Sequence, residues 1–121
     1  MRVGIDLVSV EQVRRAIADH GDHYLSRVFT PRELAETQSE PHRLAARFAA
    51  KEATIKALGA TDEGLGWSSI GVAGDAAGRP GLELTGAAAE LAQRRGIASL
   101  SVSLTHTGDH AAAVVLAGAR S

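Results

Sequence analysis

Residues 43–58 read Arg-Leu-Ala-Ala-Arg-Phe-Ala-Ala-Lys-Glu-Ala-Thr-Ile-Lys-Ala-Leu, and this stretch decides the fold. At about 100° per residue on a helical wheel, Leu44, Phe48 and Ile55 form one apolar stripe, and alanines cover much of the remaining surface. A helix that is apolar nearly all round is buried in the protein. We therefore predict a central, buried helix from about His42 to Leu58.

Four charged side chains interrupt this helix. Lys51 falls inside the apolar stripe, and Arg47, Glu52 and Lys56 flank it. A buried charge without a partner costs several kcal/mol, which favours a compensating ion or ligand. Glu52 and Lys56 at (i, i+4) also fit an ordinary helix salt bridge worth about 0.2–0.5 kcal/mol, and Lys51 can extend its ammonium to solvent. The helix alone leaves both interpretations open.

An acidic residue in the first predicted strand adds a second signal. Residues Val3 to Ser9 alternate in the manner of a strand, with Asp6 in its interior, an unusual place for a carboxylate. Mg²⁺ is commonly held by one or two carboxylates together with phosphate oxygens. Asp6 and Glu52 therefore predict a magnesium site, and the cations of the helix predict a diphosphate ligand beside it.

The rest of the chain alternates helix and strand signals. Ser9 and Thr30 begin helices as N-caps, and glycines or prolines end most elements. The second half contains strand patterns and a tight turn at Gly78-Arg79-Pro80. The class is α+β, an antiparallel sheet with packed helices. The predicted helices are 10–20, a short turn at 24–29, one starting at Thr30, 42–58 and 85–95, and the predicted strands are 3–9, 67–73, 81–84, 97–105 and 110–117.

Composition narrows the function classes. A chain of 121 residues is expected to form one domain, residues 1–121. It has no cysteine, which excludes disulfides, thiolate metal sites and cysteine nucleophiles and fits a cytoplasmic protein. The net charge of −1 and the lack of a basic arm argue against nucleic-acid binding. The longest apolar run, Ala111 to Ala117, is too short to cross a membrane.

Four ordered segments of the chain form a recognisable set. They are Val3-Gly4-Ile5-Asp6, residues 47–57 (Arg-Phe-Ala-Ala-Lys-Glu-Ala-Thr-Ile-Lys-Ala), Gly78-Arg79-Pro80 and residues 102–107 (Val-Ser-Leu-Thr-His-Thr). The pairing of Gly-Ile-Asp near the start with Lys-Glu-x-x-x-Lys about 45 residues later is specific. Together the segments resemble the holo-acyl-carrier-protein synthases, the short class of 4'-phosphopantetheinyl transferases, and the resemblance extends from residue 3 to about residue 117.

The resemblance implies a set of ligand contacts. Asp6 and Glu52 match the magnesium-binding carboxylates of the family, and Lys56 matches the lysine that meets the phosphates of coenzyme A. Thr105-His106 resembles the segment at the adenosine 3'-phosphate, and Gly78-Arg79-Pro80 resembles the turn against the adenine. The coenzyme A contacts expected from the residues and the resemblance together are Arg47, Lys51, Lys56, Gly59, Arg79, Pro80, Thr105 and His106.

The implied reaction is attack by a serine hydroxyl of an acyl carrier protein on the β-phosphate of coenzyme A. Such a transfer needs positioning and charge neutralisation more than covalent help from the enzyme. Lys56, with Lys51, would stabilise charge on the departing adenosine 3',5'-bisphosphate. Glu52 and a magnesium-bound water remain alternative bases. The resemblance also implies a homotrimer with each site between two subunits, acting in fatty acid or polyketide biosynthesis.

A basic surface on the first helices is the expected docking region for an acidic carrier protein. Its arginines are Arg14, Arg15 and Arg27, although many family members carry an arginine at the position of Gln12 instead. A solvated amphipathic helix explains the same charges equally well. The glycine-rich stretch usual after the second lysine is also altered, because it reads Gly59-Ala60-Thr61-Asp62 in this chain.

Competing interpretations of the chain predict different behaviour. A non-catalytic module would bind coenzyme A or a carrier protein without turnover, and a structural oligomer would show no magnesium-dependent binding. A zinc pair of His106 and His110 lacks a third ligand nearby. A hydrolase built on Ser103, Thr105 and His106 lacks the glycine pattern of a nucleophile elbow.

Overall fold

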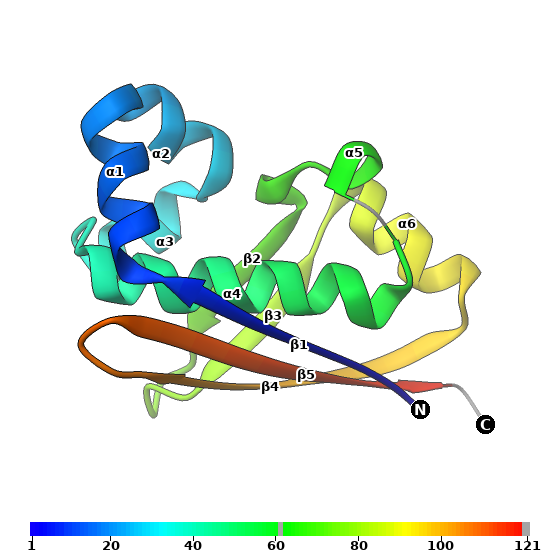
Figure 1. Ribbon diagram of the computed structural model, residues 1–121. Coiled ribbons are helices and arrows are strands. Elements are labelled where there is room, and N and C mark those ends of the chain that lie inside the picture. The colour runs from blue at the N-terminus through cyan, green and yellow to red at the C-terminus, as the bar shows by residue number, and fades with distance from the viewer. Residues whose placement is uncertain (61, 120–121) are drawn as a thin grey trace.

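A long central helix lies across a three-stranded antiparallel sheet in the computed structural model, which describes residues 1–60 and 62–119 (Figure 1). The other helices gather at the two ends of this helix. The elements are β1 (Arg2–Ser9), α1 (Val10–His20), α2 (Asp22–Val28), α3 (Pro31–Thr37), α4 (Pro41–Leu58), α5 (Asp62–Leu65), the 3₁₀ turn η1 (Trp67–Ser69), β2 (Ile70–Gly74), β3 (Pro80–Leu84), α6 (Gly86–Arg94), β4 (Ile97–His106) and β5 (His110–Ala119).

The predicted α+β class is confirmed, with two antiparallel sheets. The larger sheet has the order β1-β5-β4, and β5 is central, as its run of small apolar residues predicts. Asp6 of β1 pairs with Ala113 of β5, and Ala113 pairs with Leu104 of β4. The smaller sheet joins β2 and β3. Both sheets contact α4, which is therefore buried between them.

Gly4 sets how closely β1 approaches α4. A Cβ atom at this position would overlap the carbonyl oxygen of Ala53 and would lie 2.8 Å from the backbone nitrogen of Ala57. The alanines of α4 leave room for this approach, and Gly4 completes it because it has no side chain. The crossing places Asp6, two residues further along β1, beside the last turns of α4.

The helices α1 and α3 begin where the sequence predicts, whereas the turn predicted at 24–29 is the longer helix α2, Asp22–Val28. Ser9 accepts a hydrogen bond from the backbone of Gln12, and Thr30 and Glu33 form a complete capping box with Pro31 at the first helical position. Gly59 ends α4 in the left-handed conformation, at φ 71°. Local capping chemistry therefore fixes these boundaries.

The prediction of a strand over residues 67–73 is wrong at its start. Trp67–Ser69 forms a 3₁₀ turn, because the Ser69 hydroxyl donates to the carbonyl oxygens of Leu65 and Gly66. The helix predicted to reach Arg95 ends at Arg94, and the short helix α5 was not predicted. Within the described residues, no helix is long and apolar enough to span a membrane.

The face of β1 that points away from α4 is exposed and apolar. Val3, Ile5 and Leu7 are between 62% and 67% exposed, and Leu116 of β5 is 43% exposed. Gly4 and Val8 point the other way and are buried against the core. The strand alternates as predicted, but its most apolar side faces outward.

Candidate active site

A lysine at the end of α4 joins the two predicted carboxylates. The Nζ atom of Lys56 donates to Oδ1 of Asp6 at 2.9 Å and to the carbonyl oxygen of Ile5 at 3.0 Å. The Asp6 side chain is 16% exposed, whereas that of Lys56 is 54% exposed. Asp6 therefore lies at the bottom of the site, and Lys56 faces solvent above it.

Glu52 precedes Lys56 by one turn of α4. The hydrogen bond from Lys56 to Asp6 and the charge of Asp6 raise the pKa of Lys56, and the charge of Glu52 raises it further. Two carboxylates from separate elements thus act on one ammonium group. The prediction that Asp6 and Glu52 lie near each other rested on a strand and a helix more than forty residues apart, and the structure brings both to Lys56.

The chemistry of this pair suits a divalent cation. Carboxylate oxygens are the hard ligands that Mg²⁺ takes, and the ammonium of Lys56 already occupies a position where positive charge is stabilised. Among the described residues, no group of three or more histidine, aspartate or glutamate side chains forms a metal site. Two protein carboxylates leave the remaining positions of an octahedral ion to water and phosphate.

Lys51 has partners other than Asp6 and Lys56, and its predicted contact with coenzyme A stays a prediction. Its side chain is completely buried and forms an ion pair of 2.8 Å with Glu33, which is 1% exposed. Burial lowers the pKa of Lys51, and the charge of Glu33 opposes this shift. The compensating charge that the sequence required for Lys51 is therefore Glu33. Removing one partner of such a pair costs roughly 3–5 kcal/mol.

Arg47 also lies away from Lys56, on the side of α4 that faces β2. Its guanidinium donates to the carbonyl oxygen of Val72 at 3.1 Å and to Glu36 at 3.1 Å. A hydrogen bond from the backbone of Gly74, together with bonds from Arg47 and Arg32, lowers the pKa of Glu36. Arg47 thus points toward the end of β2, where the turn with Arg79 begins.

The predicted adenosine contacts lie across the sheet from Asp6. Arg79 and Pro80 are exposed at the turn between β2 and β3, and β3 packs beside β4. Thr105 and His106 are exposed at the end of β4, and the rings of His106 and His42 are 6.4 Å apart. The strands β1 and β4 are the two edges of the larger sheet. Asp6 therefore lies at one edge, and Thr105 and His106 lie at the other.

Gly59 is the residue at which α4 ends, three positions after Lys56. Arg95 donates to the carbonyl oxygens of Leu58 and Gly59 at 2.9 Å and 3.3 Å, and Arg2 donates to that of Leu58 at 3.4 Å. These arginines satisfy the negative end of the helix. Thr61, in the altered glycine-rich stretch after Lys56, lies outside the described residues.

A cleft of about 420 Å³, here called the aromatic cleft, opens between α2, α4 and η1. Phe48 and Trp67, which we call the floor of the cleft, line it with ring centroids 5.1 Å apart, and Phe48 lies one turn before Glu52 on α4. Arg27, a predicted docking residue, lines it, whereas Arg14 and Arg15 are exposed on α1. The lining residues are His20, His23, Tyr24, Arg27, Val28, Phe48 and Trp67.

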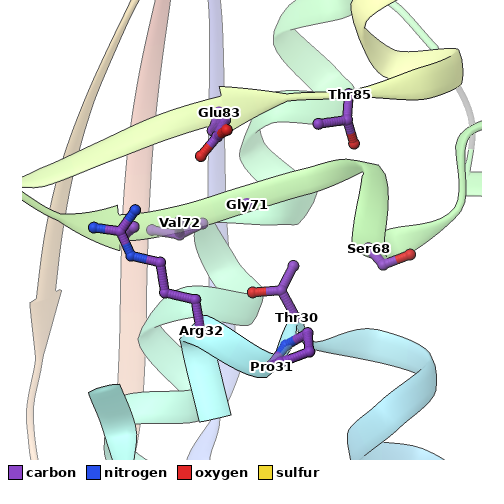
Figure 2. A pocket seen from close by; sticks show the side chains of 9 residues that line it. Thr30, Pro31, Arg32, Ser68, Gly71, Val72, Glu83 and Thr85 are labelled. Atoms are coloured by element: carbon purple, nitrogen blue, oxygen red, sulfur yellow. The ribbon is translucent and has the colours of Figure 1, made fainter. Parts of the chain in front are cut away.

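A second cavity, of about 370 Å³, contains none of the predicted site residues. Figure 2 shows Thr30, Pro31 and Arg32 of the α3 start facing Gly71 and Val72 of β2 across it. Arg32 is held by Glu36 and by the carbonyl oxygen of Gly74. This cavity belongs to the region around the buried Glu33 and not to the site at Asp6.

Three residues of this region carry structural roles that the sequence analysis missed. The sequence assigned no site role to Glu33 or Glu36, and it predicted a strand at Trp67. No sequence pattern links Glu33 to Lys51, because they lie on different helices 18 positions apart. The only available signal was the charge of Lys51 inside an apolar stripe.

Comparison with known proteins agrees with the resemblance seen in the sequence. Residues 2–115 match the 4'-phosphopantetheinyl transferase superfamily. The chain is 44% identical to a holo-[acyl-carrier-protein] synthase of Anaeromyxobacter dehalogenans, over 97% of this chain and 95% of that protein. It is 41% identical to the enzyme of that name from Herpetosiphon aurantiacus, over 93% and 94% of the two chains.

A solved structure has the same fold. The Helicobacter pylori holo-[acyl-carrier-protein] synthase, crystallised in complex with coenzyme A, superposes with a TM-score of 0.87. The match covers 96% of this chain and 99% of that one, at 28% sequence identity. With the full-length identities above, these findings show that the chain belongs to the 4'-phosphopantetheinyl transferase superfamily, as a member of the holo-[acyl-carrier-protein] synthases.

Proposed function

We propose that this chain transfers the 4'-phosphopantetheine group of coenzyme A to a serine of an apo acyl carrier protein, using Mg²⁺ held by Asp6 and Glu52. The transfer activity follows from membership of the family. The observation that supports the site is the meeting of both carboxylates at Lys56. In the reaction, the serine oxygen bonds to the β-phosphorus, and the bond to the bridging oxygen breaks. Adenosine 3',5'-bisphosphate leaves with that electron pair.

Asp6 and Glu52 are suited to hold the ion because they are anionic and come from rigid elements, β1 and α4. The bound ion would neutralise the diphosphate and make its phosphorus more open to attack. Asp6 is fixed by its strand and by Lys56, so its carboxylate needs little reordering to bind. Preorganised charge of this kind is an efficient use of binding energy.

Lys56 is the proposed stabiliser of the leaving bisphosphate. Its ammonium is more than half exposed and remains charged, because Asp6 and Glu52 raise its pKa. Its hydrogen bond to Asp6 orients the side chain above the carboxylates. An entering phosphate would meet a cation already held in place. Glu52 would accept the serine proton, or the bound ion would supply a water that does so.

The carrier protein is proposed to dock on α1 and α2, through Arg14, Arg15 and Arg27. Arg27 lines the aromatic cleft, and Phe48, which also lines it, lies one turn of α4 before Glu52. An acidic carrier steered to these arginines would present its serine near the metal site. The sequence and the fold do not favour one class of carrier, so fatty-acid, polyketide and peptide-synthetase carriers are all candidates.

We also propose a homotrimer, with each active site completed by a neighbouring subunit. Two observations support this arrangement. The outer face of β1 and β5 exposes Val3, Ile5, Leu7 and Leu116, an apolar surface that favours an interface. Asp6 lies on the edge strand β1, whereas His106 lies on the opposite edge strand β4 and Arg79 in the β2–β3 turn, so two chains can each supply part of a site.

Mass spectrometry of the carrier tests the activity directly. Incubation with coenzyme A and Mg²⁺ should add one phosphopantetheine to an apo carrier, and a carrier whose acceptor serine is replaced by alanine is the control. Failure to modify any of several carriers would contradict the proposal.

A cytoplasmic location remains a prediction consistent with the absence of cysteine.

A further inference from the structure

We propose that Lys51 is a positioning residue, which fixes Trp67 and the floor of the aromatic cleft through its buried ion pair with Glu33. Lys51 therefore acts on the reaction without touching coenzyme A. The inference rests on the proposed function, because the cleft is assigned to the docking of the carrier protein.

The ammonium of Lys51 has all three of its donors occupied inside the protein. Its Nζ atom contacts Oε1 of Glu33 at 2.8 Å, donates to the carbonyl oxygen of Trp67 at 3.1 Å and forms a third short bond to that of Ile70. An ammonium group has three N–H donors, so none remains for a phosphate. Because the side chain has no exposed surface, a ligand cannot reach it in this conformation.

Glu33 extends the same network to two further elements. Its Oε1 accepts from the backbone nitrogen of Thr30 at 2.7 Å, and its Oε2 accepts from that of Val72 at 2.8 Å. Thr30 and Val72 also line the second cavity (Figure 2), so Glu33 is hydrogen-bonded to two of the residues around that cavity. One buried ion pair thus joins α3, α4, η1 and β2.

This network holds the floor of the aromatic cleft. The carbonyl of Trp67 is bound by Lys51, and the Trp67 ring packs against Phe48, which lies on α4 three residues before Lys51 and four before Glu52. Helix α4 is therefore attached to η1 twice, by a polar bond and by an aromatic contact. Together these bonds fix where the cleft lies relative to Glu52.

An apolar core would stabilise this region without fixing Trp67 in the same way. Hydrophobic contacts are non-directional, and replacing a buried ion pair by apolar side chains often keeps the fold. The bonds of Lys51 are directional, and they specify one position for the η1 backbone. A small displacement of a positioning element can reduce turnover even when the fold survives.

Trp67 allows the position of the cleft floor to be measured, because it is the only tryptophan in the chain. The test variant is Lys51→Met combined with Glu33→Gln, which removes both charges and avoids an unpaired buried carboxylate. We expect the fluorescence emission of Trp67 to shift and its quenching by acrylamide to rise. We also expect kcat/KM for the carrier protein to fall about 10- to 100-fold. The Kd for coenzyme A, measured by calorimetry, should change less than about threefold.

Two results overturn the proposal. If the variant melts earlier but keeps its kcat/KM below its melting temperature, the ion pair only stabilises the fold. If the Kd for coenzyme A rises tenfold or more while Trp67 emission is unchanged, Lys51 is a ligand after all. A wild-type protein that transfers no phosphopantetheine contradicts the proposed function instead, and the emission change then still reports on Lys51.

A second variant tests the inference if the double variant does not fold. Trp67→Leu alters the cleft floor and leaves the backbone carbonyl available to Lys51. We expect the same loss in kcat/KM for the carrier protein, with coenzyme A binding retained. If the triple variant Lys51→Met, Glu33→Gln and Trp67→Leu folds, its kcat/KM should fall no further than that of Trp67→Leu alone. The ion pair and the Trp67 ring act through the same element, so their effects should not add. An unchanged kcat/KM for Trp67→Leu overturns the proposal.

Discussion

The Nζ atom of Lys56 lies 2.9 Å from Oδ1 of Asp6, and this contact joins the last turn of α4 to the first strand. Glu52, one turn earlier on α4, also acts on the same ammonium. The site is thus a point where a strand and a helix cross, and Gly4 sets the closeness of that crossing.

Replacing Lys56 by methionine is expected to reduce kcat by about 100-fold, since one preorganised cation at a developing charge contributes on this scale. The melting temperature should change little, because exposed ion pairs contribute little to stability. Steady-state kinetics and thermal melting check both points. Arg43→Met is the matched control, since Arg43 is an exposed cation on the same helix. Equal losses in the two variants would contradict a specific role for Lys56.

Adding one methyl group at Gly4 should disrupt the crossing of β1 and α4. The new Cβ in Gly4→Ala would meet the backbone of Ala53 and Ala57, and backbone atoms cannot move aside as a side chain can. We expect a destabilisation of about 1–3 kcal/mol or more, with loss of activity because Asp6 is displaced. Gly64→Ala is the control, since nothing lies within 4 Å of its Cβ position. Chemical denaturation measures both, and equal stability in the two variants would refute the packing argument.

Acid stability should depend on Glu40, the N-cap of α4. Its side chain accepts from the backbone nitrogens of His42 and Arg43, and the hydrogen bond with the His42 side chain is the main cause that lowers the pKa of Glu40 to about 2. Because this pKa is lowered from 4.5 by folding, the stabilisation is complete above about pH 4.5 and is lost as the pH falls toward 2.

The variant Glu40→Ala should therefore be less stable than the wild type by about 1 kcal/mol at pH 7, the usual contribution of an N-cap. The gap should close as the pH is lowered toward 2. Urea denaturation across this range measures the difference. A gap that stays constant with pH would show that the carboxylate charge is not involved.

Arg27 should contribute to carrier binding through charge. We expect Arg27→Ala to raise the KM for an acidic carrier about fivefold or more at low salt, with a smaller effect at high salt, because salt screens the attraction. Arg94→Ala, an exposed arginine on α6 at the other end of the molecule, is the control. Equal effects of the two variants would place the docking surface elsewhere.

Local chemistry made most of the fold predictable from the sequence. The caps at Ser9 and Thr30 and the alanine-rich stretch of α4 fixed the helices correctly. The start of β2 was wrong because the bonds that turn residues 67–69 come from the Ser69 hydroxyl, which has no strong sequence signature. Predictions failed where a single side chain redirects the backbone.

The sequence also predicted some parts of the site better than others. Asp6, Glu52 and Lys56 were predicted together because the motif spacing survives in the sequence, and the structure brings them together. The sequence predicts a ligand for Lys51, whereas the structure pairs Lys51 with Glu33, a buried side chain on another helix. Charge in an apolar stripe signals a partner, but the sequence does not say whether that partner is a ligand or another side chain.

Calorimetric titration of coenzyme A into the protein, with Mg²⁺ or with EDTA, tests the central claim most directly. We expect Mg²⁺ to tighten binding to the wild type and to the control Glu90→Gln, which removes an exposed carboxylate on α6. The same addition should have no effect on Asp6→Asn or Glu52→Gln, because each lacks one of the two ligands of the ion. If both variants keep the full response to Mg²⁺, Asp6 and Glu52 do not hold the metal, and the proposed site is wrong.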